Sequence, residues 1–248
     1  MKAAYIINEI ELHAPKSLMM DFDFAGLNFG DENQEVDSVL LCENVTIDVL
    51  KEAKENNCQM IISHHPAIWE EGDDKLTKDI IKFAKKEKLV LYSAHTNLDA
   101  AKDGINERLC KLLNIKIQSG ENSCYRIGTF VKEDTLFNKK EEIAISLNDK
   151  NIRTVGDLNR QIKTVCVSCG AGARDDELVE MLNKEKIDLL IGGENKLSLA
   201  IKMRYYNICL IEVGHYNSEI ICMEIFEDWL KNLGIKTIKS KKDINPYN

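Results

Sequence analysis

The chain has 248 residues, of which 44% are hydrophobic and 30% are charged, enough to bury a core in one large α/β unit or two smaller lobes. Its 33 basic and 41 acidic residues give a formal net charge of −8 at pH 7, and no long basic segment offsets this charge. The balance argues against a general nucleic-acid-binding protein, whose surface must neutralise phosphates.

Membrane and secretory signals are absent from the sequence. No apolar run approaches the roughly 20 residues that a helix needs to span a bilayer, and residues 1–5 do not lead into the apolar core of a signal peptide. Several of the eight cysteines lie inside apolar runs, where a reduced thiol packs as a small hydrophobic side chain. We therefore expect a cytoplasmic protein with no disulfide bonds and no membrane partner.

Strand-like and helix-like segments alternate in the first half of the chain. Apolar positions at helical spacing predict a helix over residues 3–12, and segment 22–31, with its two glycines, is typical of an irregular loop or a short strand pair. The regular part then predicts strand 36–42, helix 46–55, strand 60–63, helix 76–86, strand 89–93 and helix 104–113. Such alternation indicates βαβ units and a largely parallel sheet.

The second half resumes this alternation after a turn at residues 119–123. The pattern predicts strand 125–131, helix 136–147, strand 164–168, helix 175–184, strand 187–191, helix 196–205, strand 208–213 and helix 218–233, which Gly234 closes. No linker rich in Pro, Gly or Ser separates the halves. We therefore expect an α/β fold of two packed lobes, residues 1–118 and 119–248, with mostly parallel sheets and a site in the cleft between them.

Two adjacent histidines end one of the expected strands. The apolar run 61–63 stops at His64 and His65, and Pro66 ends the strand because it lacks an amide hydrogen. Each imidazole needs partners for both ring nitrogens, so two of them at the mouth of a buried strand suggest a bound metal. Because side chains alternate along an extended backbone, we expect the two rings to serve two different ions. The alternative is one buried and one exposed histidine without a metal.

A third histidine and a carboxylate follow the next expected strand. His95 lies just beyond residues 89–93, and Asp99 comes four residues later. The carboxyl ends of neighbouring parallel strands meet at one edge of a sheet, so we expect these two side chains to share one crevice with His64 and His65. The alternative makes Asp99 a helix cap and His95 a hydrogen-bonded loop residue.

The last expected strand-to-helix junction supplies His215 and Glu219, four residues apart. If the helix begins at Asn217 or Ser218, which are preferred capping residue types, both side chains can face the same point beyond the strand end. The same interval is also common in simple hydrogen-bonded pairs. Four of the five histidines thus lie at three expected strand ends, and two of them have a carboxylate four residues on.

Together these positions offer enough ligands for two divalent ions if a carboxylate or a hydroxide bridges the ions. The expected ligands are His64, His65, Asp99, His215 and Glu219. A mixed set of imidazoles and carboxylates suits zinc, iron or manganese and excludes a purely hard calcium site. A single ion bound by a subset of these ligands is the simpler alternative.

These motifs, in this order, resemble the NIF-three-like dinuclear-metal proteins, often labelled GTP cyclohydrolase 1 type 2 homologues, over nearly the whole chain. The matching segments are Ile61-Ile62-Ser63-His64-His65-Pro66, His95-Thr96-Asn97-Leu98-Asp99, Gly104-Ile105-Asn106, Arg126-Ile127-Gly128, Gly170-Ala171-Gly172 and Gly214-His215-Tyr216-Asn217-Ser218-Glu219. The resemblance implies the same five metal ligands. It also implies a homo-oligomer, built as a hexameric ring of two-lobed subunits, without the domain inserted in longer relatives.

The sequence departs from the family pattern outside the expected ligand set. Gly192-Gly193-Glu194 keeps a glutamate but lacks a family threonine, and the histidine that usually follows is missing near Ser198. Residues 22–27 stand where the family has a Trp-Asp-Asn-x-Gly-Leu segment, and Glu43-Asn44 replaces a frequent aspartate.

The expected function is that of a metal-dependent hydrolase. Two ions would supply a bridging hydroxide near neutral pH and polarise a carbonyl, a phosphoryl group or a purine-ring carbon, and His95 or Glu194 would move the proton. The family label points to a GTP cyclohydrolase-like reaction on a nucleotide, and a phosphoester or another small molecule fits the same chemistry. The competing expectation is a non-enzymatic metal-binding scaffold or regulatory oligomer.

Overall fold

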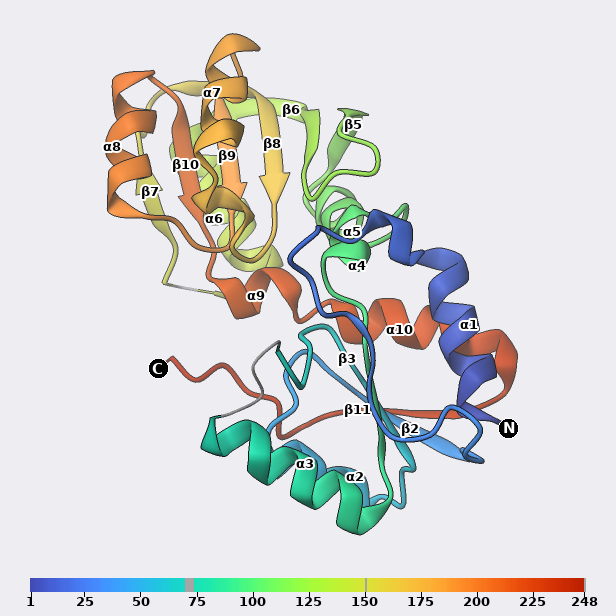
Figure 1. The fold of residues 1–248 in the computed structure, drawn as a ribbon. Helices are drawn as coiled ribbons and strands as arrows, with labels where there is room; N and C mark the ends of the chain where they lie inside the picture. The colour runs from blue at the N-terminus through green and yellow to red at the C-terminus, as the bar shows by residue number, and fades with distance from the viewer. Residues whose placement is uncertain (70–73, 150, 248) are drawn as a thin grey trace. The chain divides into compact units, whose positions relative to one another are not determined.

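The computed structural model of the protein describes residues 1–69, 74–149 and 151–247, which form two compact units (Figure 1). Unit 1 comprises Met1–Ala101 and Ile220–Asn248, and unit 2 comprises Lys102–Glu219. The expected boundary after residue 118 therefore lies inside unit 2, and the chain returns to unit 1 in its C-terminal segment. Its strand β11 (Lys236–Lys239) pairs in parallel with β2 (Ser38–Cys42) of the N-terminal segment.

Unit 1 is built on a five-stranded sheet with the strand order β1-β4-β3-β2-β11. Besides β2 and β11, its strands are β1 (Gly26–Phe29), β3 (Met60–Ser63) and β4 (Val90–Ser93). Strands β4, β3, β2 and β11 run parallel, and β1 pairs antiparallel with β4. Every residue of β2, β3 and β4 is buried, as expected for continuous apolar strands in a sheet that helices cover on both faces.

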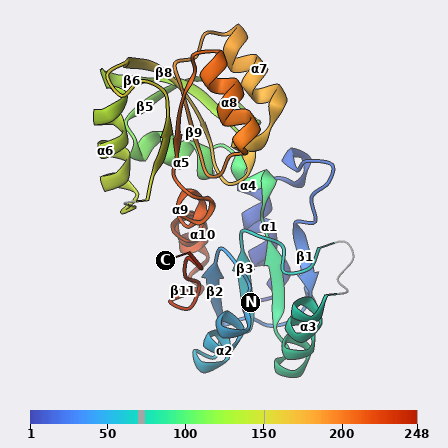
Figure 2. The same ribbon diagram turned by 90° about the vertical axis from the view of Figure 1, so that its left-hand side faces the viewer.

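Helices pack on both faces of this sheet (Figures 1 and 2). One face carries α2 (Ile47–Glu55) and α3 (Lys75–Glu87), and the other carries α1 (Ala3–His13) and α10 (Cys222–Leu230), which contact each other. The short helices of unit 1 are η1 (Lys16–Leu18), α4 (Thr96–Ala100) and η3 (Lys231–Leu233). The helices expected over residues 3–12, 46–55 and 76–86 are confirmed as α1, α2 and α3, and each observed end lies within one residue of the expected end.

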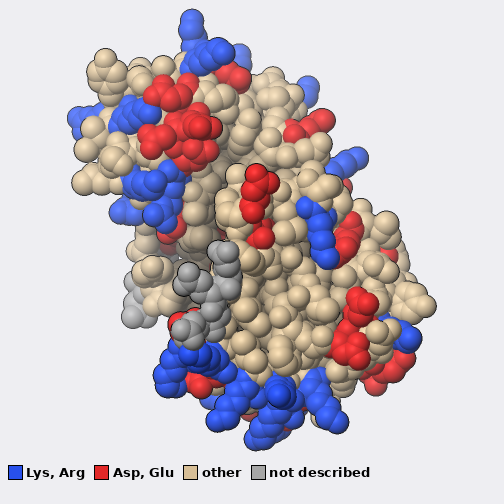
Figure 3. Space-filling model, viewed as in Figure 1, with Lys and Arg blue, Asp and Glu red and all other residues tan. Residues whose placement is uncertain are grey.

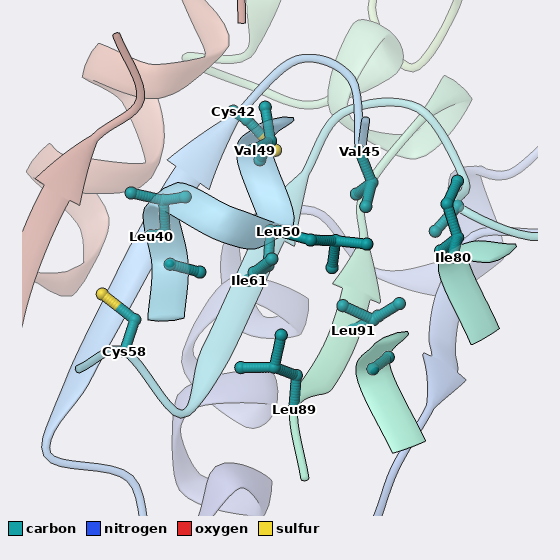
Figure 4. Packing of buried hydrophobic residues seen from close by; sticks show 13 residues of the cluster. Leu40, Cys42, Val45, Val49, Leu50, Cys58, Ile61, Ile80, Leu89 and Leu91 are labelled. Carbon is teal, nitrogen blue, oxygen red and sulfur yellow. The ribbon is translucent and has the colours of Figure 1, made fainter. Parts of the chain in front are cut away.

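A core of aliphatic side chains and cysteines lies between the sheet and helices α2 and α3 (Figure 4). Leu40, Ile61 and Leu91 extend into it from three adjacent strands. Val49 and Leu50 of α2 meet them, and both are fully buried. Because strand side chains alternate, the intervening strand residues face the opposite layer, where the buried side chains of α1 and α10 lie.

Unit 2 contains a six-stranded sheet with the strand order β5-β6-β8-β9-β10-β7. Its strands are β5 (Ile115–Ser119), β6 (Arg126–Thr135), β7 (Arg153–Val155), β8 (Gln161–Ser168), β9 (Leu189–Gly192) and β10 (Cys209–Glu212). The three central strands β8, β9 and β10 are parallel, while β5, β6 and β7 pair antiparallel with their neighbours. The sheet is therefore mixed. The loops that follow its three parallel strands carry Gly170, Glu194 and His215.

Two pairs of helices accompany the sheet of unit 2. Helices α7 (Asp176–Lys184) and α8 (Leu197–Tyr205) enclose one core with Cys166, Leu190 and Leu210 of the parallel strands. Helices α5 (Ile105–Leu112) and α6 (Leu136–Ser146) contact β6 and β8. The short helices of this unit are η2 (Gly172–Arg174) and α9 (His215–Glu219). The α/β class expected from the sequence is confirmed.

The last expected helix, residues 218–233, is two helices in the structure. Helix α9 ends at Glu219, where unit 2 ends, and α10 begins at Cys222 in unit 1. Helix α9 buries Ser218 and Glu219, whereas α10 buries a separate apolar stripe that includes Phe226 and Leu230. The helix is interrupted because its two parts contribute to the cores of different units. Gly234 ends the following turn with a left-handed φ of 67°, as expected.

Lysines gather on the exposed face of α3, seen in blue at the bottom of Figure 3. They are Lys75, Lys78, Lys82, Lys85 and Lys86. Lys75 forms an ion pair with Asp79, four residues on, as is common on solvated helix faces. Among the residues that the structure describes, no helix combines the length and the apolar character required to cross a membrane.

Truncation of Leu50 tests the core of unit 1. The substitution Leu50→Ala should lower the free energy of unfolding by roughly 3 kcal/mol, because it leaves a cavity among side chains that are fully buried. Leu12→Ala is the matched control, since Leu12 is also helical but 78% exposed, and its cost should stay below about 0.5 kcal/mol. Urea unfolding followed by circular dichroism measures both values, and equal losses would contradict this packing.

Candidate metal centre

Three histidines lie together at the carboxyl edge of the sheet of unit 1. His64 and His65 directly follow β3, and His95 comes two residues after the end of β4. Strands β3 and β4 are parallel neighbours that end in register, with Ser63 beside Ser93. The ring centroids are 4.8 Å apart for His64 and His65, 5.2 Å for His64 and His95, and 5.4 Å for His65 and His95.

The geometry allows His64 and His65 to bind one ion together, contrary to the expectation from strand alternation. Each of the three histidines offers a ring nitrogen, and these nitrogens all lie within 4.8 Å of one another. The alternation rule does not apply here because β3 already ends at Ser63, whose hydroxyl donates to the His65 carbonyl at 2.7 Å in a tight turn. His95, which was expected to move a proton, is also within reach of such an ion.

All three rings use the same nitrogen, Nδ1, at hydrogen-bond distance from an oxygen atom. The pairs are His64 with the Ala94 carbonyl at 3.0 Å, His65 with Asn44 Oδ1 at 2.8 Å and His95 with Asp23 Oδ1 at 2.9 Å. These oxygens can only accept, so Nδ1 carries the proton in each neutral ring and Nε2 keeps its lone pair. Metal-binding histidines are commonly oriented in this way.

Asp99 adds a carboxylate to this group. It lies inside α4 and is 7% exposed, and its Oδ1 is 3.7 Å from Nε2 of His64. The residue therefore does not cap α4, which was the alternative from the sequence. Three imidazole nitrogens and a nearby carboxylate oxygen form the donor set that zinc, iron or manganese would accept. The residues of unit 1 thus fit a divalent metal ion.

Asp23 holds the His95 ring and the start of α4. Its carboxylate accepts hydrogen bonds from His95 Nδ1, from the Thr96 amide at 3.0 Å and from the Thr96 hydroxyl, and its side chain is shielded from solvent. Burial alone would raise the pKa of Asp23, but the hydrogen bond and charge of His95 and the bonds from Thr96 lower it to about 2. Sequence reasoning missed this role because Asp23 lies in the irregular segment 22–31, far from His95 in the chain.

A second group of candidate ligands lies in unit 2, after strand β10. His215 and Glu219 stand at the two ends of α9, with Nε2 of His215 2.9 Å from Oε2 of Glu219. The helix begins at His215 itself and not at Asn217 or Ser218. Glu194, the other expected proton carrier, has Oε1 at 3.4 Å from Nδ1 of His215. The interval of four residues therefore brings the side chains together as expected.

Two carboxylates set the protonation of His215. Burial alone would lower the pKa of His215, but the hydrogen bond and charge of Glu219, with a contribution from Glu194, raise it to about 9. Glu194 is shared with Arg174, whose Nη1 lies 3.0 Å from the same Oε1 atom. A metal ion bound at His215 would therefore replace a proton, which is usual for metal ligands.

Glycine is required where the loop after β8 approaches Glu219. Gly170 has a left-handed φ of 53°, and a Cβ atom on it would lie 1.8 Å from Oε1 of Glu219. Its amide donates to the Ser218 hydroxyl at 2.9 Å, and its carbonyl accepts from the Glu194 amide at 2.9 Å. This loop therefore positions α9 and Glu194 together.

Residues 1–246 match the family model described as Duf34/NIF3 (NGG1p interacting factor 3). The chain belongs to the Duf34/NIF3 family. The resemblance expected from the order of the motifs is thereby confirmed. Two Duf34/NIF3 relatives, from Clostridium acetobutylicum and Clostridium perfringens, are each named GTP cyclohydrolase 1 type 2 homolog. They are 32% and 34% identical over all of this chain, which covers 98% and 99% of their own lengths.

Solved structures share the Duf34/NIF3 fold. A hypothetical protein of Staphylococcus aureus has a TM-score of 0.90 at 22% identity and covers 100% of this chain and 99% of its own. The reduced form of HcgD from Methanocaldococcus jannaschii has a TM-score of 0.81 at 27% identity and covers 97% of this chain and 98% of its own. The first of these comparisons supports the fold alone, because its identity is low.

The contact between Gly170 and Glu219 can be tested through the pKa of His215. In chelator-treated protein, Gly170→Ala should displace the Glu219 carboxylate, so the pKa of His215 should fall from about 9 by roughly 1 or more. Gly234→Ala is the matched control, because Gly234 also has a left-handed φ but has nothing within 4 Å of the added Cβ. Titration of the histidine signals by NMR measures the pKa, and an unchanged value in Gly170→Ala would refute the proposed contact.

Proposed function

We propose that this Duf34/NIF3 protein is a hydrolase that requires divalent metal ions. The observation that carries the proposal is that an oxygen acceptor faces Nδ1 of each of three imidazoles in unit 1, so that Nε2 of His64 and His65 can bind a metal and Nε2 of His95 can take a proton. The nearby carboxylate of Asp99 and the pair of His215 and Glu219 in unit 2 supply further ligands of the same chemical type.

The proposed cofactor is a pair of zinc, iron or manganese ions, held by His64, His65, Asp99, His215 and Glu219. That all five ligands serve one pair of ions stays a prediction from the sequence. When bound, such ions lower the pKa of a water molecule and polarise the substrate group under attack. The chain's own residues orient the ligands and move protons.

Two residues are proposed to carry protons. Asp23 accepts a hydrogen bond from Nδ1 of His95, so Nε2 is the nitrogen at which His95 would take a proton. Glu194 lies between Arg174 and His215, and this position leaves its carboxylate next to a proposed ligand. Nη1 of Arg174, 3.0 Å from Oε1 of Glu194, holds this carboxylate in place beside His215.

The proposed substrate is a small molecule of the nucleotide or phosphoester class. The relatives named GTP cyclohydrolase 1 type 2 homolog support a purine nucleotide, and a phosphoester needs the same combination of ligands and proton carriers. We further propose a hexameric ring as the assembly, on the basis of the family resemblance, and a cytoplasmic location. Analytical ultracentrifugation measures the assembly directly.

Substitution of single histidines tests the metal requirement. His65→Ala and His215→Ala should each lose bound metal and reduce hydrolysis by at least about 100-fold, because each removes a ligand. His13→Ala is the control: this fifth histidine lies within α1 and follows no strand, and it stacks on Trp229 with ring centroids 4.7 Å apart. Elemental analysis gives the metal content, and assays on GTP, phosphodiesters and amides give turnover.

The same measurements separate an enzyme from a scaffold. A hydrolase should lose turnover on treatment with chelator and recover it when zinc, iron or manganese is added back. If chelation dissociates the oligomer while the untreated protein hydrolyses none of these substrates, the hydrolase proposal fails. The metal would then have a structural role. One metal ion per chain at full occupancy would contradict the dinuclear site.

A further inference from the structure

The C-terminal segment of the chain reaches the edge of the sheet at which the three histidines lie. Strand β11 runs parallel to β2, with Lys239 beside Leu41, and the next amide, that of Ser240, donates to the Leu41 carbonyl at 2.8 Å. Both strands therefore end at the same edge. The residues that follow β11 arrive beside the residues that follow β2, which are Glu43 and Asn44.

A buried carboxylate in α2 fixes this segment. Glu52 is 7% exposed and accepts hydrogen bonds from the Ser240 hydroxyl and from the amides of Lys241 and Lys242. The Ser240 hydroxyl oxygen in turn accepts from the amide of Asp243 at 3.1 Å. The carboxylate of Glu52 thus accepts several hydrogen bonds at once and holds residues 240–243 in a tight turn. This turn fixes the position of the Asp243 side chain.

Asp243 then holds the turn after β2. It is 5% exposed, and its Oδ2 atom accepts from the amides of both Glu43 and Asn44, the latter at 2.9 Å. The paired residues of β11 and β2 end at Lys239 and Leu41, before these bonds begin. Asp243 therefore fixes the backbone conformation of residues 43–44.

The side chain of Asn44 connects this turn to His65. Its Nδ2 donates to Oε1 of Glu43 at 3.2 Å, and its Oδ1 lies 2.8 Å from Nδ1 of His65. Because a carboxylate can only accept, the amide group of Asn44 can face Glu43 only with its nitrogen, and its oxygen must face the imidazole. His65 is thereby held with its proton on Nδ1, and Nε2 keeps the lone pair that a metal would need.

We propose that Asp243 and Asn44 are positioning residues for His65, through which the C-terminal segment sets the tautomer and the direction of one proposed metal ligand. The consequence for metal affinity rests on the proposed function. The consequence for the tautomer does not, because it concerns the metal-free imidazole alone.

The tautomer of His65 in metal-free protein is the first measurement. Imidazole nitrogen shifts, measured by NMR after chelation, should show His65 protonated at Nδ1 in the wild type and in Ile244→Ala. Ile244 is the matched control because it adjoins Asp243 and is 70% exposed. Asp243→Ala and Asn44→Ala should each give a mixture with the Nε2-protonated form, and Asn44→Asp, which keeps an oxygen acceptor, should restore the wild-type tautomer.

Zinc affinity is the second measurement. Titration calorimetry should give a 10- to 100-fold weaker affinity for Asp243→Ala and Asn44→Ala, the usual effect of removing a group that orients a ligand. The double variant should be no worse than Asn44→Ala, since both residues act along one path. A tautomer change without loss of affinity would support the positioning role and remove His65 from the ligand set.

An unchanged His65 tautomer in Asp243→Ala, with the protein folded, would overturn the proposal. If Asp243→Ala does not fold, Asn44→Ala decides, because Asn44 is only half-buried and its side chain closes no core. A wild-type tautomer in folded Asn44→Ala would equally overturn it. Circular dichroism and urea unfolding establish the folded state of each variant.

Discussion

The parallel pairing of β2, β3 and β4 is the constraint on which the chemistry of unit 1 depends. Cys42 lies beside Ser63, and Ser63 beside Ser93, so three strands end in one line. A parallel sheet sends every following loop to the same edge. The loops after β3 and β4, which carry the histidines, therefore meet the loop after β2, which carries Asn44. Asp23 reaches the same edge from just before β1, whose first residue, Gly26, lies beside Ser93 in an antiparallel pair. Strand β11 pairs in parallel with β2, so a fourth strand ends at this edge.

Oxygen acceptors for the ring nitrogens are the second requirement. A neutral imidazole offers one lone pair, and its use as a metal ligand depends on which nitrogen carries the proton. In unit 1 this choice is made by a backbone carbonyl, a side-chain amide and a carboxylate, one for each ring. The acceptors differ in chemistry, yet all place the proton on Nδ1. His215 in unit 2 differs, because both its ring nitrogens face carboxylates and the pKa is raised to about 9.

Two of the departures from the family pattern lie beside proposed metal ligands. Asn44, from the Glu43-Asn44 pair that replaces a frequent aspartate of the expected pattern, has its side-chain oxygen 2.8 Å from Nδ1 of His65. Glu194, which keeps the family glutamate without its threonine, lies beside His215 and Arg174. In both cases the residue lies next to a proposed ligand. These two departures therefore lie beside proposed ligands, whereas the proposed ligands lie in the motifs that carry the resemblance.

The sequence by itself determined the α/β class, most of the strands and helices, and the candidate ligands at three strand ends, because apolar periodicity and strand-end position are local signals. It did not reveal the short polar strands β5, β7 and β11, whose pairing is decided by their neighbours in the sheet. Nor did it reveal that the C-terminal segment returns to unit 1.

Only the tertiary structure assigned Asp23, Asn44 and Asp243 their roles. Each is separated from the group it holds by roughly 20 to 200 residues of chain, and such contacts leave no periodic trace in a sequence. The tertiary structure also allowed His64 and His65 to share an ion, since the strand ends one residue before them. Local patterns thus indicate the candidate ligands, while oxygen acceptors from other parts of the chain decide which ring nitrogen of each histidine in unit 1 carries the proton.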